Sequence, residues 1–242
     1  NVNQDAACAV CQPQQLGQSY TNWGSTECSN QTMLYRGYIM ANYYNQYKSE
    51  FVCVDEDRQY HEKSSSSDHN GNRWYTTEYQ TGALPSPPFT NDMEVGCSKC
   101  TTNDERAVYT RWGHKDCPSG NELIYSGFAA GSHRNNQGAG YNALCLNPDP
   151  TQLEGSTSDR NGARLYGTEY ENTGAADKNH DHDAACAVCK STGVSTYVQW
   201  GRHTCEYGVT EYSGYVMASY NNQYKSEFVC VDADREYHTK SS

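Results

Sequence analysis

The sequence predicts a mainly β protein made of tandem, loop-rich modules that disulfide bonds staple together. Twelve cysteines fall in regular clusters along 242 residues, and only 36% of the residues are hydrophobic, so the apolar core must be thin. Short stretches rich in Val, Tyr, Thr and Trp, such as 195–200 and 228–231, are separated by clusters of Gly, Asn, Ser and Pro. Because no apolar period of 3.6 residues extends over a dozen positions, we expect strands rather than helices.

A unit of four cysteines repeats three times. The pair Cys8-Ala-Val-Cys11 returns at 97–100 and 186–189 with a constant interval between copies, and two single cysteines follow each pair. A Tyr-x-x-Trp-Gly motif opens each unit, and we expect its tryptophans, Trp23, Trp112 and Trp200, to lie in the core. The twelve cysteines, all expected to be oxidised, are Cys8, Cys11, Cys28, Cys53, Cys97, Cys100, Cys117, Cys145, Cys186, Cys189, Cys205 and Cys230.

The repeat divides the chain into three units, 1–100, 101–183 and 184–242. The first two units carry a tail after their last single cysteine, whereas the third has none, so the chain is out of register with its own repeat. Either a segment of another protomer completes the third unit, or the 242 residues belong to a longer array. Both alternatives stay open, and the unmatched module edge favours a homo-oligomer.

The cysteines indicate an oxidising compartment. A zinc site in each unit is the alternative, since a Cys-x-x-Cys pair with two further cysteines suits a tetrahedral thiolate site. A polar, cysteine-rich chain is more typical of secreted proteins, in which bridges replace part of the core, so we expect disulfides and a secreted, extracellular protein. Four cysteines allow three pairings within a unit. Bridges across the tails are also open: Cys53 with Cys97, Cys145 with Cys186, and Cys8 with Cys230.

Charge and hydropathy exclude several classes of partner. The formal net charge is −11 and no stripe of Lys or Arg is present, which argues against binding of nucleic acid. The longest apolar runs cover a few residues, far short of the roughly 20 that span a bilayer, so no membrane insertion is expected. No charged and apolar leader opens the chain at Asn1, and we expect any signal peptide to be removed already.

The residues also argue against an enzyme. No nucleophile elbow or catalytic metal motif is present. When the three copies are aligned, the positions equivalent to His114 and His203 are occupied by residues other than histidine. A catalytic histidine would also need its own orienting partner. We therefore expect no catalytic residues and no cofactor.

Several motifs resemble the globular module of the short-chain-collagen C4-like proteins of marine invertebrates. They are Trp-Gly-x-x-x-Cys, Tyr-Ser-Gly-Phe-Ala-Ala-Gly-Ser-His at 125–133, Cys-Leu-Asn-Pro-Asp-Pro at 145–150, Leu-Tyr-Gly-Thr-Glu-Tyr at 165–170, His-Asp-His-Asp-Ala-Ala-Cys-Ala-Val-Cys at 180–189 and Tyr-Ser-Gly-Tyr-Val-Met-Ala at 212–218. The resemblance covers nearly the whole chain, but no Gly-X-Y segment is present, so no collagen role follows. It implies an extracellular module of the kind found in matrix, mucus and egg-coat proteins, some of which resemble soluble lectins. It supplies no catalytic residues.

Carbohydrate binding is the chemistry that the residues favour. Aromatic faces stack on a pyranose ring while planar amides and charged groups take its hydroxyls, and repeated weak sites gain strength through multivalency. The alternative is that Tyr47 and Tyr224 are packing residues and that the amides build turns. The candidate sugar-binding residues are Asn45, Gln46, Tyr47, Lys48 and Glu50 in the first unit, His133, Arg134 and Asn135 in the second, and Asn222, Gln223, Tyr224, Lys225 and Glu227 in the third.

The predicted function is therefore that of a secreted, multivalent lectin whose partners are glycans or glycoproteins. Galactosides and acidic sugars such as uronates are the candidate ligands, the latter because Lys48, Lys225 and Arg134 could pair with a carboxylate. The alternative is a structural or adhesive matrix or mucus protein that polymerises through its incomplete modules, with its 21 tyrosines as interface side chains.

Two smaller features complete the sequence predictions. Asn30-Gln-Thr is the only glycosylation sequon, and we expect it in a turn where an oligosaccharide would project into water. His180-Asp-His-Asp183 could offer alternating cation ligands, but a solvated acidic loop is the favoured interpretation, so no metal site is expected.

Overall fold

A computed structural model describes residues 5–14, 17–60, 71–153, 159–171 and 180–238. All regular secondary structure in these ranges is β, which confirms the predicted mainly β, disulfide-stapled class, and none of their segments is a helix long and apolar enough to span a bilayer. The strands are β1 (Ser19–Trp23), β2 (Thr32–Ala41), β3 (Val52–Asp55), β4 (Tyr75–Gln80), β5 (Gly96–Thr101), β6 (Val108–Trp112), β7 (Glu122–Gly131), β8 (Leu144–Leu146), β9 (Ala163–Gly167), β10 (Ala185–Lys190), β11 (Gly214–Met217) and β12 (Val229–Asp232).

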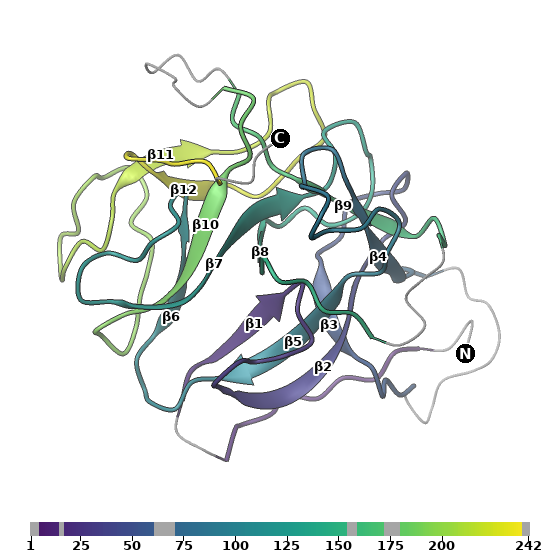
Figure 1. Cartoon of the computed structure of the whole chain (residues 1–242), viewed down its shortest axis with the longest axis horizontal. Helices are drawn as coiled ribbons and strands as arrows, with labels where there is room; N and C mark the ends of the chain where they lie inside the picture. Colours follow the sequence, from purple (N-terminus) through teal and green to yellow (C-terminus); the bar gives the residue numbers. More distant parts are fainter. Residues whose placement is uncertain (1–4, 15–16, 61–70, 154–158, 172–179, 239–242) are drawn as a thin grey trace.

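The Cys-x-x-Cys segment forms the central strand of a module. In module 1 (β1, β2, β3 and β5), β5 lies antiparallel between β1 and β2, and β3 pairs with the far part of β2. Module 2 (β6, β7, β8 and β10) repeats this arrangement, with β10 between β6 and β7, as Figure 1 shows. Both central strands consist largely of small residues and are almost wholly buried, which suits a strand that is covered on both faces.

The disulfides join each central strand to the single cysteines that precede it in the chain. The bridges are Cys28–Cys100 and Cys53–Cys97 in module 1, and Cys117–Cys189 and Cys145–Cys186 in module 2. Two of the three pairings across the tails that the sequence left open are thus formed. The Cys pair therefore ends a folded module rather than beginning it, so strand pairing does not follow the sequence boundary between 183 and 184.

A glycine of the repeat allows the second and third strands of each module to approach closely. A Cβ at Gly37 would collide with the carbonyl oxygen of Val54, and the equivalent Gly127 and Gly214 meet the carbonyl oxygens of Leu146 and Val231 in the same way. The Tyr-x-Gly pattern in all three units is therefore a packing requirement of this strand pair.

Successive modules join by a parallel bridge and by their tails. Leu146 of β8 pairs with Trp23 of β1, and Val231 of β12 pairs with Trp112 of β6. The tail strands β4 and β9 are parallel to each other and pair with β2 and β7, so the strands β7, β8, β1, β5, β2, β4 and β9 close into a ring. The largest buried cluster, which includes Phe128, takes its side chains from these strands and the loops between them.

Candidate functional site

The predicted sugar-binding residues lie on three equivalent loops. Each loop joins the second strand of a unit to the third: loop A covers 42–51, loop B covers 132–143 and loop C covers 218–228. The sequence predicted the loops separately, and nothing in it predicted their contacts with one another.

Loop B lies between loops A and C and is hydrogen-bonded to both. The Ser49 amide donates to the Ala139 carbonyl at 2.9 Å, and the Lys48 ammonium donates to the Ser132 hydroxyl. On the other side, the Tyr224 amide donates to the Arg134 carbonyl at 3.1 Å, and the Glu227 amide donates to the Tyr141 carbonyl at 2.8 Å. The three loops therefore form one continuous surface, which we call the loop ridge.

Most candidate residues of loops A and C face solvent. Tyr47 is 77% exposed and Tyr224 is 44% exposed, so neither is a core residue. Their exposure favours the binding interpretation of these tyrosines over the packing interpretation. The other exposed candidates on the loop ridge are Asn45, Gln46, Glu50, Arg134, Asn135, Asn222, Lys225 and Glu227.

Some candidate residues use their polar side-chain atoms in hydrogen bonds within the protein. The Gln223 side-chain oxygen accepts a hydrogen bond from the Tyr220 amide at 3.2 Å, and a Glu227 carboxylate oxygen accepts one from the Ala143 amide at 3.0 Å. Lys48 is half-buried, and this burial lowers the pKa of its ammonium to about 8. These three side chains hold the loop ridge together, and only part of their hydrogen-bonding capacity remains for a ligand.

The basic groups of loop B are also engaged. Arg134 lies 3.6 Å from the Glu171 carboxylate. His133 packs its ring against Tyr166 at 4.9 Å between centroids, and burial, together with the charges of Arg134 and Lys48, lowers the pKa of the histidine. Three basic side chains are candidates for pairing with a sugar carboxylate. Lys48 is half-buried and Arg134 lies near Glu171, whereas Lys225 is exposed to solvent.

Two exposed tyrosines of the loop ridge were missed by the sequence reasoning. Tyr220 is 66% exposed on loop C and Tyr141 is 43% exposed on loop B. Tyr220 aligns with Tyr43 when the first and third units are compared, so the repeat itself carried the signal. For Tyr141 no sequence signal was available, because loop B differs in length and composition from the others.

The carboxylate clusters divide into exposed and buried ones. In the His180-Asp-His-Asp183 segment, His180 and Asp181 are exposed and form a cluster with Glu171, with ligand atoms within 4.8 Å of one another, whereas Asp183 is buried. A second cluster unites Glu78, Asp92 and Asp159, whose ligand atoms lie within 4.8 Å of one another.

Glu78 is the buried member of that second cluster. One of its oxygens accepts a hydrogen bond from the Arg160 amide, and the other has no partner among the described residues. Burial is the main cause that raises the pKa of this carboxyl, and the charges of Asp159 and Asp92 add to it. Its geometry could hold a hard cation through carboxylate oxygens.

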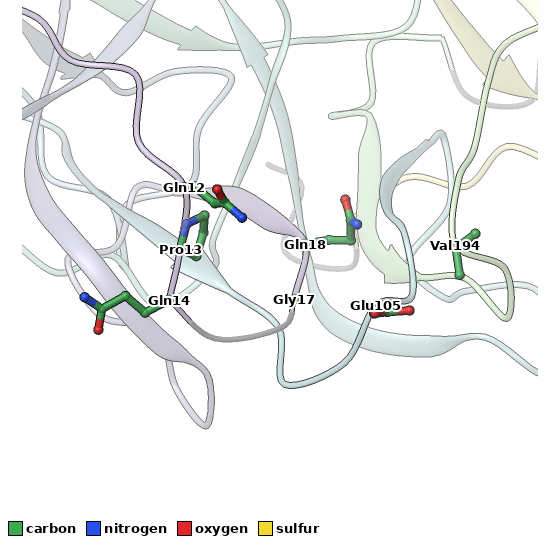
Figure 2. A pocket seen from close by; sticks show the side chains of 7 residues that line it. All are labelled: Gln12, Pro13, Gln14, Gly17, Gln18, Glu105 and Val194. Atoms are coloured by element: carbon green, nitrogen blue, oxygen red, sulfur yellow. The ribbon is translucent and has the colours of Figure 1, made fainter.

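A polar hollow lies away from the loop ridge. Figure 2 shows Gln12 and Gln14 on the segment before β1, with Gln18 at the strand and Glu105 across from them. Side-chain amides dominate this wall, and Glu105 adds a carboxylate to it. The hollow therefore offers groups that can form hydrogen bonds with a polar ligand.

Module 3 (194–232, with β11 and β12) is open where the other modules are closed. Its hairpin pairs with β6, but no central strand lies beside β11 within the described residues. Trp23 and Trp112 pack against buried clusters as predicted, whereas Trp200 is 51% exposed and lines an apolar hollow with Val216 and Phe228. The prediction of a core position is therefore wrong for Trp200, because the strand that would cover it is absent.

Four cysteines are unpaired within the chain. Cys8 and Cys11 are exposed, and Cys205 and Cys230 are half-buried in module 3. Eight of the twelve cysteines thus form the predicted disulfides, and oxidation of the other four stays a prediction. Asn30 is exposed in the turn between Cys28 and β2, a position open to an oligosaccharide, and its modification also stays a prediction.

No protein-family model matches the chain, and no solved structure matches it. The resemblance to the short-chain-collagen C4-like module therefore rests on the sequence motifs alone.

Proposed function

We propose that the chain is a secreted, non-enzymatic, multivalent carbohydrate-binding protein. The observation that carries the proposal is the loop ridge, on which exposed tyrosines alternate with exposed amide side chains across three hydrogen-bonded loops. A tyrosine ring covers the apolar face of a pyranose, and neighbouring amides donate to and accept from its hydroxyls. Because the ridge is continuous, it suits several residues of an extended glycan or several ends of a branched one.

The candidate ligands are galactosides and acidic sugars, and an experiment must distinguish between these two classes. Lys225 carries the case for a uronate, since Lys48 is half-buried against Ser132 and Arg134 faces Glu171. A single exposed ammonium adds a charge-assisted hydrogen bond to a carboxylate but is not needed for a neutral galactoside. Substitution of Lys225 by Gln should therefore weaken binding of uronates while leaving binding of galactosides unchanged.

A glycan array combined with haemagglutination tests the proposal. The double substitution Tyr47→Ala with Tyr224→Ala should lower the agglutination titre at least about tenfold, since each stacking contact is worth about 1 kcal/mol. Tyr207→Ala is the matched control, because Tyr207 is 79% exposed and lies outside the loop ridge. Absence of glycan binding by the wild-type protein at every concentration, or equal loss in the control, would overturn the proposal.

A structural or adhesive role is the second candidate. It is favoured by the open module 3, whose exposed apolar hollow and unpaired cysteines suit an interface with another chain. Light scattering separates the two functions: long polymers without sugar binding favour the structural role, and a discrete oligomer whose binding is inhibited by sugar favours the lectin.

A further inference from the structure

The first and third modules contain the same third-strand sequence in different surroundings. Residues 45–55 and 222–232 are identical, yet Phe51 is 1% exposed and Phe228 is 67% exposed. In the same way Ile39 is fully buried, whereas its counterpart Val216 is 53% exposed. Module 3 therefore has the side chains of a closed module, but no element among the described residues covers them as module 1 is covered.

One missing element is a central strand with two cysteines. In modules 1 and 2 the first single cysteine pairs with the second cysteine of that strand, and the second single cysteine pairs with the first. Cys205 and Cys230 occupy the positions of the two single cysteines and have no partner within the chain. A strand that closes module 3 must therefore carry the pattern Cys-x-x-Cys.

The segment 5–11 has this pattern and no module around it. Its sequence, Asp-Ala-Ala-Cys-Ala-Val-Cys, is identical to that of 183–189, which contains most of β10. Its cysteines, Cys8 and Cys11, are exposed and unpaired. The segment thus has the sequence of a central strand, but among the described residues its β pairing is confined to the isolated bridge at Ala6.

Segment 5–11 contacts the module that follows it in the chain in the same way as the central strand β10 contacts module 3. Ala6 forms an antiparallel bridge to Tyr60 after β3, and Ala184, before β10, forms the same bridge to Tyr237 after β12. Segment 5–11 therefore lies against module 1 as β10 lies against module 3. In Figure 1 the chain near N and the β11–β12 hairpin lie on opposite sides of the molecule, so one copy does not bring its two open parts together.

We propose that module 3 of one copy is completed by segment 5–11 of a second copy, and that two intermolecular disulfides lock this head-to-tail contact. The registers of modules 1 and 2 fix the geometry, because they are the same in both. Cys8 lies opposite Trp200 and Gly214, Cys11 lies opposite Tyr197, and the bridges are Cys8–Cys230 and Cys11–Cys205.

A further contact follows from the junctions between modules. Leu146 pairs with Trp23, and Val231 pairs with Trp112, in each case through the residue after the second single cysteine. In module 1 that residue is Val54, and the strand that contains it, β3, pairs only with β2. Val54 of the second copy therefore pairs in parallel with Trp200 and helps to cover its ring.

The bridges form by thiol–disulfide exchange with an oxidised dithiol or glutathione-type disulfide. The Cys11 thiolate attacks one sulfur of the oxidant, releases one thiol and forms a mixed disulfide. The Cys205 thiolate then attacks the Cys11 sulfur and releases the second thiol. The two protein thiols lose two electrons and two protons, which the oxidant gains, and the second bridge forms in the same way.

Two complementary variants test the proposal on the full chain in a glutathione redox buffer. Cys8→Ser with Cys11→Ser leaves an intact open module 3, and Cys205→Ser with Cys230→Ser leaves an intact segment 5–11. Each variant alone should give no covalent oligomer on a non-reducing gel, and their mixture should give a covalent dimer and nothing longer. The wild-type protein should give a ladder.

Peptide mapping identifies the bridges and the chains that they join. With one variant labelled with ¹⁵N, the cross-linked peptides should contain Cys11–Cys205 and Cys8–Cys230, each with one labelled half. The four bridges inside modules 1 and 2 serve as the folding control for both variants. Wild-type bridges within a single chain, Cys8–Cys11 and Cys205–Cys230 pairs, four thiols that stay free, or a mixture that stays monomeric would each overturn the proposal.

The inference does not depend on sugar binding. Agglutination and array binding of the same two variants give a separate readout, so failure of the lectin proposal and failure of the head-to-tail contact are distinguishable. A monomer that binds glycans overturns only the contact, and a disulfide-linked polymer without glycan binding overturns only the lectin.

Discussion

Modules 1 and 3 show how one sequence reaches two states of burial. Eleven identical residues form the third strand and its loop in both, but Phe51 is buried in module 1 whereas Phe228 remains exposed in module 3. The difference lies in elements distant along the chain: module 1 has β5 beside β2, and Gly140 of loop B lies directly against the Phe51 ring. Burial of a short strand is thus decided by its partners, and its local sequence supplies only the side chains that partners can cover.

Cysteine substitutions should give the largest difference in stability loss between module 1 and module 3. Removal of Cys53–Cys97 by serine substitutions frees a loop with a sequence separation of 44 and should lower the free energy of unfolding by about 4 kcal/mol in the chain-entropy account. Cys230→Ser, at the equivalent position in module 3, should leave the unfolding of the monomer unchanged. Denaturant unfolding under non-reducing conditions measures both. Equal losses at the two positions would contradict the contrast between the modules.

The equivalent phenylalanines give the next contrast. Phe51→Ala removes a fully packed ring and should cost about 3 kcal/mol, the lower end for a buried aromatic residue. Phe228→Ala should cost less than about 0.5 kcal/mol in the monomer, as for most exposed positions. Urea midpoints of the two variants decide the matter. In the disulfide-linked dimer, the Phe228 substitution should become costly in the completed module 3.

The two junctions between modules differ in charge. At the first junction, the Asn147 side-chain amide nitrogen donates to the Asn22 side-chain oxygen at 3.1 Å. At the second, Arg111 and Asp232 form an ion pair at 2.6 Å, and both side chains are little exposed. Asp232→Asn should cost about 2 kcal/mol, because it leaves the guanidinium without its charged partner. Asn147→Ala should cost about 1 kcal/mol, as for a neutral hydrogen bond. Thermal unfolding of both variants tests this order, which a larger loss for Asn147→Ala would reverse.

The smallest expected effect concerns Glu78, which belongs to the tail of module 1. Its raised pKa means that the folded state favours the protonated carboxyl, so its contribution to stability is present at acidic pH and lost as the pH rises through the raised pKa. Glu78→Gln should therefore raise the melting temperature at pH 7 and change it little at pH 4. Glu50→Gln, on an exposed loop residue, is the control. A Ca²⁺-dependent rise of the wild-type melting temperature that the variant lacks would instead indicate a cation at this carboxylate.

Much of the architecture could be predicted from the repeat. The β class, the disulfides and the incomplete third unit follow from cysteine spacing and composition. The connectivity did not, because the spacing is equally compatible with bridges inside a unit and across a tail, and only the placement of β5 between β1 and β2 distinguishes them. For the same reason Trp200 is expected in the core from its motif, which matches that of Trp23, but no described strand lies beside Trp200 as β5 lies beside Trp23.

The sequence could predict that the candidate residues lie in loops, but not the role of each side chain. Exposure of Tyr47 and Tyr224 agrees with a binding role, whereas the sequence could not separate ligand groups from groups that build the ridge. Gln223 and Glu227 bond to backbone amides, and these contacts depend on the fold of loops B and C. Amide and carboxylate side chains satisfy a turn as readily as a sugar hydroxyl, so composition alone does not assign their role.

The parallel bridge that joins successive modules has a consequence for any assembly of this chain. Leu146 pairs with Trp23 and Val231 pairs with Trp112, so both junctions join equivalent residues in the same parallel sense, and the contact is heterologous. An array continued through such junctions has polarity: one end presents thiols on a segment that lacks a module, and the other presents thiols in an open groove. A peptide with the sequence of residues 5–11 would therefore cap only the groove end, and the ratio of cap to chain would set the length of the array.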